Sequence, residues 1–145
     1  MVSDEDLNTV QDKIAYRFKN RNLLRCALTT EDEAGNKGRE RLAMFGDAAL
    51  KTHLATEGHN CQAPTERIAR VVSDIIRPTN MAAVGLELTR AIEDDQDEGS
   101  NASLGVMATT ANATLGAVWF DCDCRMQYFE EVVDSLRLSW AANAP

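Results

Sequence analysis

Two acidic residues on one predicted helix have the side-chain types and spacing best suited to chemistry. Glu40 and Asp47 lie seven residues apart, and Gly46 directly precedes Asp47. Residues three, four or seven apart share one face of an α-helix. Two carboxylates on one face indicate a site for a divalent metal ion, which prefers oxygen ligands. Ala43 lies on the same face, and its methyl group cannot ligate a metal.

The pattern of apolar residues is helical throughout and predicts an all-α protein, because no stretch alternates in the manner of a strand. Ser3, Asn20 and Ser103 are expected to cap helices, the last one reaching Phe120. Pro64 is expected in the first turn of another helix. The remaining predicted helices run from Glu40 to about His59, from Pro78 through Leu88, and from Met126 to near Trp140.

The segments between these helices are polar. Glu31 to Gly38 is predicted to form a loop with two glycines, and Glu93 to Ser100 a strongly acidic loop. At 145 residues the chain is long enough for one hydrophobic core, so we expect a single domain over residues 1–145.

The net charge of −8 limits what the protein can bind. Tight, non-specific binding of nucleic acid draws mainly on lysine and arginine neutralising phosphates. We therefore expect weak RNA binding, or binding through a local patch only. The best candidates for such a patch, which an ordinary solvated surface would explain equally well, are Lys13, Arg17, Lys19, Arg21 and Arg25.

No targeting or membrane segment is expected. The first residues are acidic, unlike a signal or transit peptide. The uncharged run from Gly99 to Phe120 is long enough to cross a bilayer, but its serines, threonines and asparagines indicate a buried helix instead. The prediction is an intracellular protein, cytoplasmic or nuclear. Its four cysteines match no common zinc spacing, so they are interpreted as reduced thiols.

Three segments together resemble the ribonuclease III catalytic domain. Ile14 to Asn20 resembles the opening of that family, Glu40 to Leu50 its signature helix, and Leu115 to Asp121 the end of its second metal-bearing helix. The order and spacing agree, and the resemblance spans most of the chain. It implies an all-α, dimeric fold and a family that cuts double-stranded RNA with magnesium. A double-stranded-RNA-binding domain is not found in this sequence.

The resemblance also implies where metal ligands should be. Two-metal hydrolysis of a phosphodiester needs several carboxylates around ions about 4 Å apart. The family positions fall on Ala43 and Asp47 of the signature helix and on Thr109 and Asn112 of the later helix. Only Asp47 is acidic, so it is the one candidate ligand that remains.

Glu40 fills another acidic position of the signature helix. We interpret it as structural, paired with Arg39 or Arg41 or accepting hydrogen bonds, with metal binding as the alternative. Acids of the predicted loop from Glu93 to Glu98 are a further, poorly positioned source of ligands.

The resemblance implies a dimer contact on the signature helix as well. The residue that matches the family's inserted aromatic side chain is Met44, next to Phe45. Methionine is apolar and adaptable, so it suits such a contact, although an ordinary core position is an equal alternative.

Three functions follow as hypotheses. The favoured one is a catalytically degenerate pseudo-nuclease that serves RNA processing as a homodimeric or assembly module and needs no cofactor. The second is a divergent magnesium-dependent endoribonuclease that uses Asp47 and Glu40. The third is a heterodimer in which a catalytic ribonuclease III-fold partner supplies the acids.

Overall fold

The computed structural model describes residues 2–30, 36–92 and 103–144, and every regular element in these ranges is a helix. The helices are α1 (Asp4–Ile14), α2 (Arg21–Leu28), α3 (Asn36–Asn60), α4 (Thr65–Ile75), α5 (Pro78–Ile92), α6 (Leu104–Asp121), α7 (Met126–Ser135) and α8 (Trp140–Asn143). The predicted all-α class is confirmed. No helix in the described ranges is long and apolar enough to cross a membrane.

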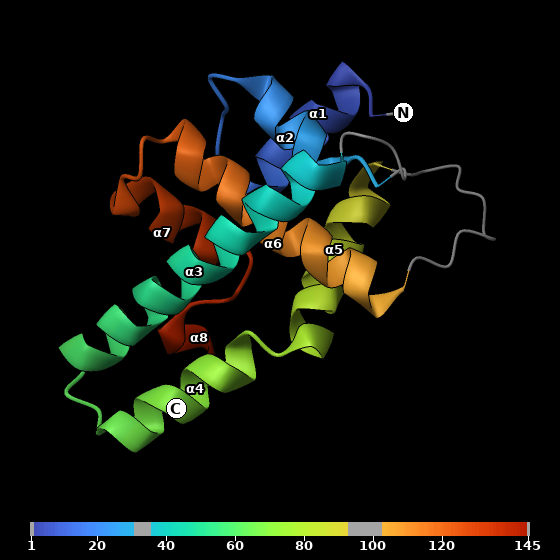
Figure 1. Ribbon diagram of the computed structural model, residues 1–145. Helices are drawn as coiled ribbons and strands as arrows, with labels where there is room; N and C mark the ends of the chain where they lie inside the picture. Colours follow the sequence, from blue (N-terminus) through green and yellow to red (C-terminus); the bar gives the residue numbers. More distant parts are fainter. Residues whose placement is uncertain (1, 31–35, 93–102, 145) are drawn as a thin grey trace.

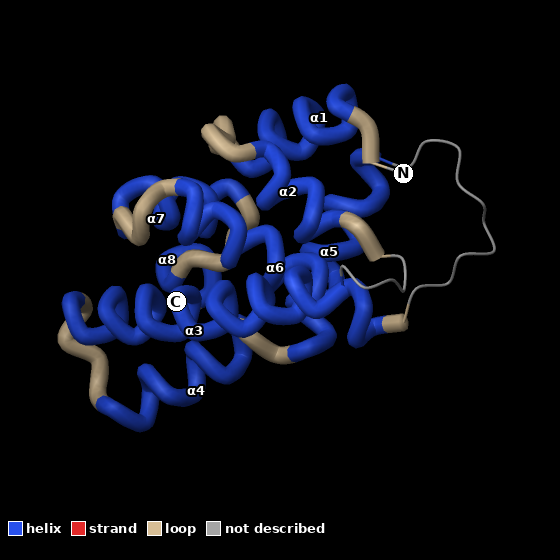
Figure 2. The backbone as a smooth tube through the Cα atoms, turned by 45° about the horizontal axis from the view of Figure 1, so that its top comes forward, coloured by secondary structure: helices blue, strands red, loops and turns tan. Residues whose placement is uncertain are grey.

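Helix α6 is the central element, and α3 makes the most extensive contact with it. In both views α3 and α6 lie between α1 and α2 at one end of the molecule and α4 at the other (Figures 1 and 2). α6 is buried on nearly all sides, as expected for a helix rich in alanine and small residues that has no charged residue before Asp121 at its end. The described part of the uncharged run, residues 103–120, therefore belongs largely to the helical core.

Local capping explains where three helices begin. Ser3 and Asp6 form a reciprocal capping box at the start of α1. The Asn20 side chain accepts a hydrogen bond from the Asn22 N–H, and Ser103 accepts one from Val106. The three predicted caps are confirmed. Pro64 lies one residue outside its helix, at the N-cap of α4, rather than in the first turn.

The signature helix begins earlier than predicted. α3 starts at Asn36, so residues 36–38 are helical and the predicted loop is wrong there; residues 31–35 and the predicted acidic loop at 93–100 lie outside the described residues. Close packing favours the longer helix, because a Cβ atom on Gly38 would lie only 3.2 Å from the Cys26 Sγ.

The last predicted helix is two helices. α7 ends at Ser135 because Arg137 adopts a left-handed conformation with φ of 59°, which an α-helix cannot continue through. Ser139 then caps α8 by accepting a hydrogen bond from the Ala142 N–H. The backbone N–H of Trp140 donates to Glu57 on α3, 3.0 Å away, which fixes the start of α8 to α3.

A buried carboxylate joins the end of α6 to the segment between α1 and α2. Asp121 accepts hydrogen bonds from the Tyr16 hydroxyl at 2.7 Å and from the backbone N–H groups of Lys19 and Asn20, each at 2.8 Å. Burial of the phenol, followed by the hydrogen bond to Asp121 and its negative charge, raises the pKa of Tyr16 above its ordinary value.

This arrangement predicts a loss of stability in alkali. A phenol whose pKa is raised on folding stabilises the fold fully below its unfolded pKa of about 10 and loses that contribution as the pH rises through the folded value. The free energy of unfolding, measured with urea at a series of pH values above 10, should therefore fall more steeply for the wild type than for Tyr16→Phe. Parallel curves for the two proteins would contradict the assignment.

Candidate functional site

Two glycines bring the backbones of α3 and α6 into direct contact. A Cβ atom on Gly46 would lie 1.9 Å from the Asn112 carbonyl oxygen, and a Cβ atom on Gly116 would lie 1.9 Å from the Leu42 carbonyl oxygen. Any larger residue would overlap the backbone of the other helix. The two helices can approach this closely because neither glycine carries a side chain.

This contact brings the family-derived positions together. Asp47 directly follows Gly46, and Ala43 directly follows Leu42, so both lie beside points where α3 meets α6. Asn112 supplies the carbonyl oxygen at the first contact, and Thr109 lies one turn earlier on the same helix. The structure therefore places the four positions around one helix crossing, although three of them carry no carboxylate.

The side chains at the crossing are already engaged in other interactions or are neutral. The Asp47 Oδ2 lies 2.9 Å from the Lys51 Nζ, one turn further along α3. The Thr109 hydroxyl donates to the Gly105 carbonyl oxygen at 2.8 Å. The Asn112 Oδ1 is buried and has no hydrogen-bond partner among the described residues. A donor set of one carboxylate, one hydroxyl and one amide oxygen remains.

This donor set does not fit the pair of magnesium ions that the family resemblance implies. Magnesium relies on carboxylates for charge compensation, and hydroxyl or amide oxygens supply none. Within residues 2–30, 36–92 and 103–144, nowhere do three or more acidic, histidine or cysteine side chains gather as a metal site. The buried oxygen of Asn112 lacks a donor, but one neutral oxygen cannot balance a dication.

Glu40 takes no part in this crossing as an ion pair. It is exposed on α3, and among the described residues its carboxylate forms no ion pair with Arg39 or Arg41, so the predicted ion pair is wrong, while hydrogen bonding and metal binding by Glu40 stay predictions. For Arg39 the reason is that its side chain turns inward. Arg39 is 6 % exposed, and its guanidinium donates to the Val106 carbonyl oxygen at 2.8 Å and to the Thr110 hydroxyl.

Arg39 is the functional candidate that sequence reasoning missed. Burial lowers the pKa of its guanidinium, while the nearby Cys26 and the Glu40 carboxylate act in the opposite direction. Its hydrogen bonds to the Ala27 and Val106 carbonyl oxygens join α3 to α2 and α6. The spacing places residue 39 four before Ala43 and so on the face directed at α6, but it does not reveal the carbonyl oxygens that receive the hydrogen bonds of Arg39.

Apolar side chains are exposed beside the crossing. Met44 is 64 % exposed, and Phe45 and Phe120 are 39 % and 41 % exposed. The rings of Phe45 on α3 and Phe120 on α6 pack edge to face, with their centroids 4.9 Å apart. We call these three residues the Met44 patch. Met44 is thus not a core residue of the single chain, which removes the alternative interpretation of this position.

The predicted basic patch is largely neutralised by acids. Arg17 pairs with Asp12, and Lys19 pairs with Asp123 at 3.6 Å. The remaining partners of the patch are Glu87 for Lys13, Asp4 for Arg25, and Asn8 for Arg21. Phosphate groups would have to compete with these contacts, which favours the interpretation as an ordinary solvated surface.

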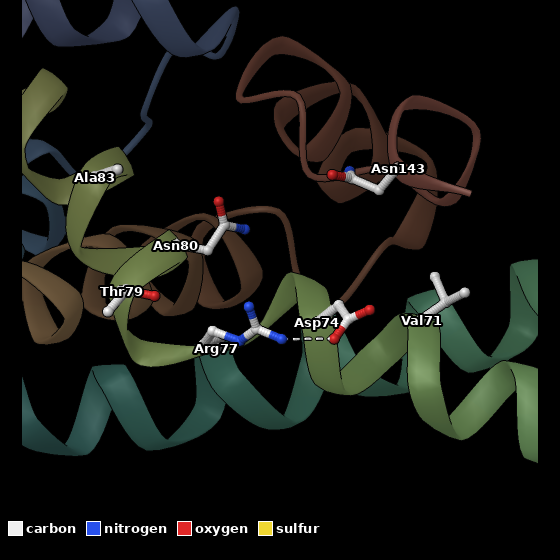
Figure 3. A pocket seen from close by; sticks show the side chains of 7 residues that line it. All are labelled: Val71, Asp74, Arg77, Thr79, Asn80, Ala83 and Asn143. Atoms are coloured by element: carbon white, nitrogen blue, oxygen red, sulfur yellow. Dashed lines mark hydrogen bonds and ion pairs between the residues drawn. The ribbon is translucent and has the colours of Figure 1, made fainter. Parts of the chain in front are cut away.

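Among the described residues, which include all four cysteines, no three histidine, cysteine or acidic side chains gather as a metal site. A cavity of about 340 Å³ lies between α4, α5 and α8, lined by Val71, Asp74, Arg77, Thr79, Asn80, Ala83 and Asn143 (Figure 3). The ion pair of Arg77 with Asp74, 2.7 Å long, lies along its edge. None of the positions at the α3–α6 crossing lines this cavity.

The described residues form an all-α fold. It resembles the nuclease domain of ribonuclease III from Campylobacter jejuni in two crystal structures. The TM-scores are 0.72 and 0.71, at 18% and 19% sequence identity, covering 90% and 96% of this chain and 92% and 99% of those chains. The second of these structures is described as showing flexibility in a region involved in dimer formation of that domain.

The sequence comparisons agree with the fold. The chain is 29% identical over 141 residues to ribonuclease 3 of Vibrio atlanticus and 24% identical over 143 residues to that of Coxiella burnetii. These matches cover 92% and 90% of this chain, which spans only about 60% of the length of these relatives. No family model matches the chain. The chain therefore resembles the nuclease domain of ribonuclease III in fold and ribonuclease 3 in sequence.

Proposed function

We propose that this protein is a catalytically degenerate ribonuclease III-fold domain, comprising residues 1–145, that acts in RNA processing as a dimerisation or assembly module. The observation that carries the proposal is the donor set at the α3–α6 crossing. Of the four positions expected to hold metal ions, only Asp47 has a carboxylate, and Lys51 contacts that carboxylate.

The size of the electrostatic deficit supports this proposal. Two magnesium ions bring four positive charges, and one carboxylate returns a single negative charge. Loss of one group that stabilises a transition state typically costs about a hundredfold or more in rate. Three such groups are replaced here by a methyl group, a hydroxyl and an amide, so we expect no useful hydrolysis.

Homodimerisation is supported by the Met44 patch and by the similar nuclease domain from Campylobacter jejuni, in which a region is involved in dimer formation. Exposed aromatic and methionine side chains are typical of protein interfaces. A heterodimer with a catalytic ribonuclease III-fold partner would use the same patch. Weak RNA binding is expected, because the net charge is −8 and the basic residues near α1 and α2 are paired.

The test is cleavage of double-stranded RNA by the purified protein over a magnesium titration. We expect no cleavage above the level of the Asp47→Ala variant, while an active ribonuclease 3 cuts the same RNA in parallel. Magnesium-dependent cleavage that disappears in Asp47→Ala would overturn the proposal and establish the divergent endonuclease instead.

A further inference from the structure

A stripe of four residues on α3 carries the charges nearest the crossing. Arg39, Ala43, Asp47 and Lys51 recur at intervals of four and follow one side of the helix. Arg39 is hydrogen-bonded to α6, and Lys51 is paired with Asp47. The two family-derived positions on α3 are therefore bracketed by side chains of fixed positive charge.

The contact between Lys51 and Asp47 has favourable geometry. The acid lies four residues before the base, which is the better order for a pair on a helix. Their side chains are 49% and 36% exposed, so the pair adds little to the stability of the fold. The ion pair matters instead because it determines which cation lies next to the Asp47 carboxylate.

We propose that the Lys51 ammonium group replaces the divalent ion at this site, so that the crossing carries its own cation and excludes metal. This inference rests on the proposed function and explains how the site remains electrostatically balanced without magnesium. A tethered ammonium is always within reach of Asp47, whereas magnesium must give up water to bind and finds a single carboxylate. The positive charge of Lys51 also repels an incoming dication.

The other groups at the crossing fit the same account. Arg39 adds a second fixed positive charge on the stripe, bonded to Thr110, the neighbour of Thr109. The Asn112 Oδ1 adds an acceptor without charge and without a partner among the described residues. With the carboxylate of Glu40, which shares the helical face of Asp47, the charges of Arg39, Asp47 and Lys51 sum to zero, so a further cation has no net negative charge to bind.

The experiment measures manganese binding by electron paramagnetic resonance, without any RNA. The carboxylates are restored by Ala43→Glu, Thr109→Asp and Asn112→Glu, once with Lys51 present and once combined with Lys51→Ser. Removing a positive charge a few ångströms from the ion should tighten binding at least about tenfold. Lys13→Ser, combined with the same three changes, alters the total charge equally but breaks only the contact with Glu87, and it should leave the affinity unchanged.

Equal manganese affinities with Lys51 and with Lys51→Ser would overturn the inference. If the triply substituted proteins do not fold, Ala43→Glu with and without Lys51→Ser decides, because it adds one carboxylate four residues before Asp47. The melting temperature of Ala43→Glu should not respond to manganese, whereas that of Ala43→Glu combined with Lys51→Ser should rise. The same response, or none, in both proteins would also overturn it. Cleavage of RNA by the wild type would overturn the proposed function instead, so the two can fail separately.

Discussion

Gly46→Ala is expected to destabilise the protein by at least about 3 kcal/mol, because the added methyl group would overlap the backbone of a neighbouring helix. The added Cβ atom would lie 1.9 Å from the Asn112 carbonyl oxygen and 2.7 Å from the Gly116 nitrogen. Both atoms belong to the backbone of α6, which cannot move aside as a flexible side chain does. The measurement is urea-induced unfolding followed by circular dichroism.

Gly105→Ala is the matched control for this substitution. Gly105 lies in the first turn of α6, where a Cβ atom would meet nothing nearer than the Ser103 Oγ at 3.8 Å. Alanine should stabilise the helix there by about 0.5–1 kcal/mol. Similar unfolding curves for Gly46→Ala and the wild type would mean that α3 and α6 do not meet as described.

Met44→Asp is expected to dissociate the proposed homodimer. A side chain that is 64 % exposed in the single chain would lie in an apolar contact between subunits, and a buried carboxylate without a partner opposes such a contact. Residues at the centre of an interface typically cost about 2–4 kcal/mol when lost, which is roughly a 30- to 1,000-fold change in the dissociation constant. Sedimentation velocity over a range of protein concentrations measures it.

Leu104→Asp provides the comparison for the dimer experiment. Leu104 is 62 % exposed, almost the same as Met44, but it lies at the first residue of α6 rather than in the Met44 patch. It should leave the association constant unchanged. A wild type that sediments as a monomer at every concentration, or equal effects of the two substitutions, would contradict a dimer built on this patch.

The helical architecture could be predicted because its signals are local. Ser3, Asn20 and Ser103 are oxygen-bearing side chains that satisfy the free N–H groups of the turn that follows, whatever the rest of the chain does. The left-handed residue Arg137 could not be predicted, since arginine has no preference for positive φ. The prediction of one continuous helix from Met126 to near Trp140 is wrong for that reason.

The candidate site was predictable as a set of positions but not as a set of interactions. Spacing alone places Ala43 and Asp47 on one helical face and Thr109 and Asn112 on another. The burial of Arg39 depends on carbonyl oxygens of α2 and α6, which no helical pattern reveals. The ion pair of Asp47 with Lys51 is different, because acidic and basic residues four apart on a helix can be recognised in the sequence. This pair was overlooked in the sequence.

The glycine contact between α3 and α6 has a consequence for how such a protein evolves. Selection for a stable fold keeps Gly46 and Gly116 small, and that alone holds the backbone at residues 43, 109 and 112 in register after their ligands have been replaced. On the proposed function, loss of chemistry here would need only changes of side chain, with no redesign of the scaffold. The chain would then be a starting point for engineering, in which carboxylates are introduced at residues 43, 109 and 112 without moving a helix.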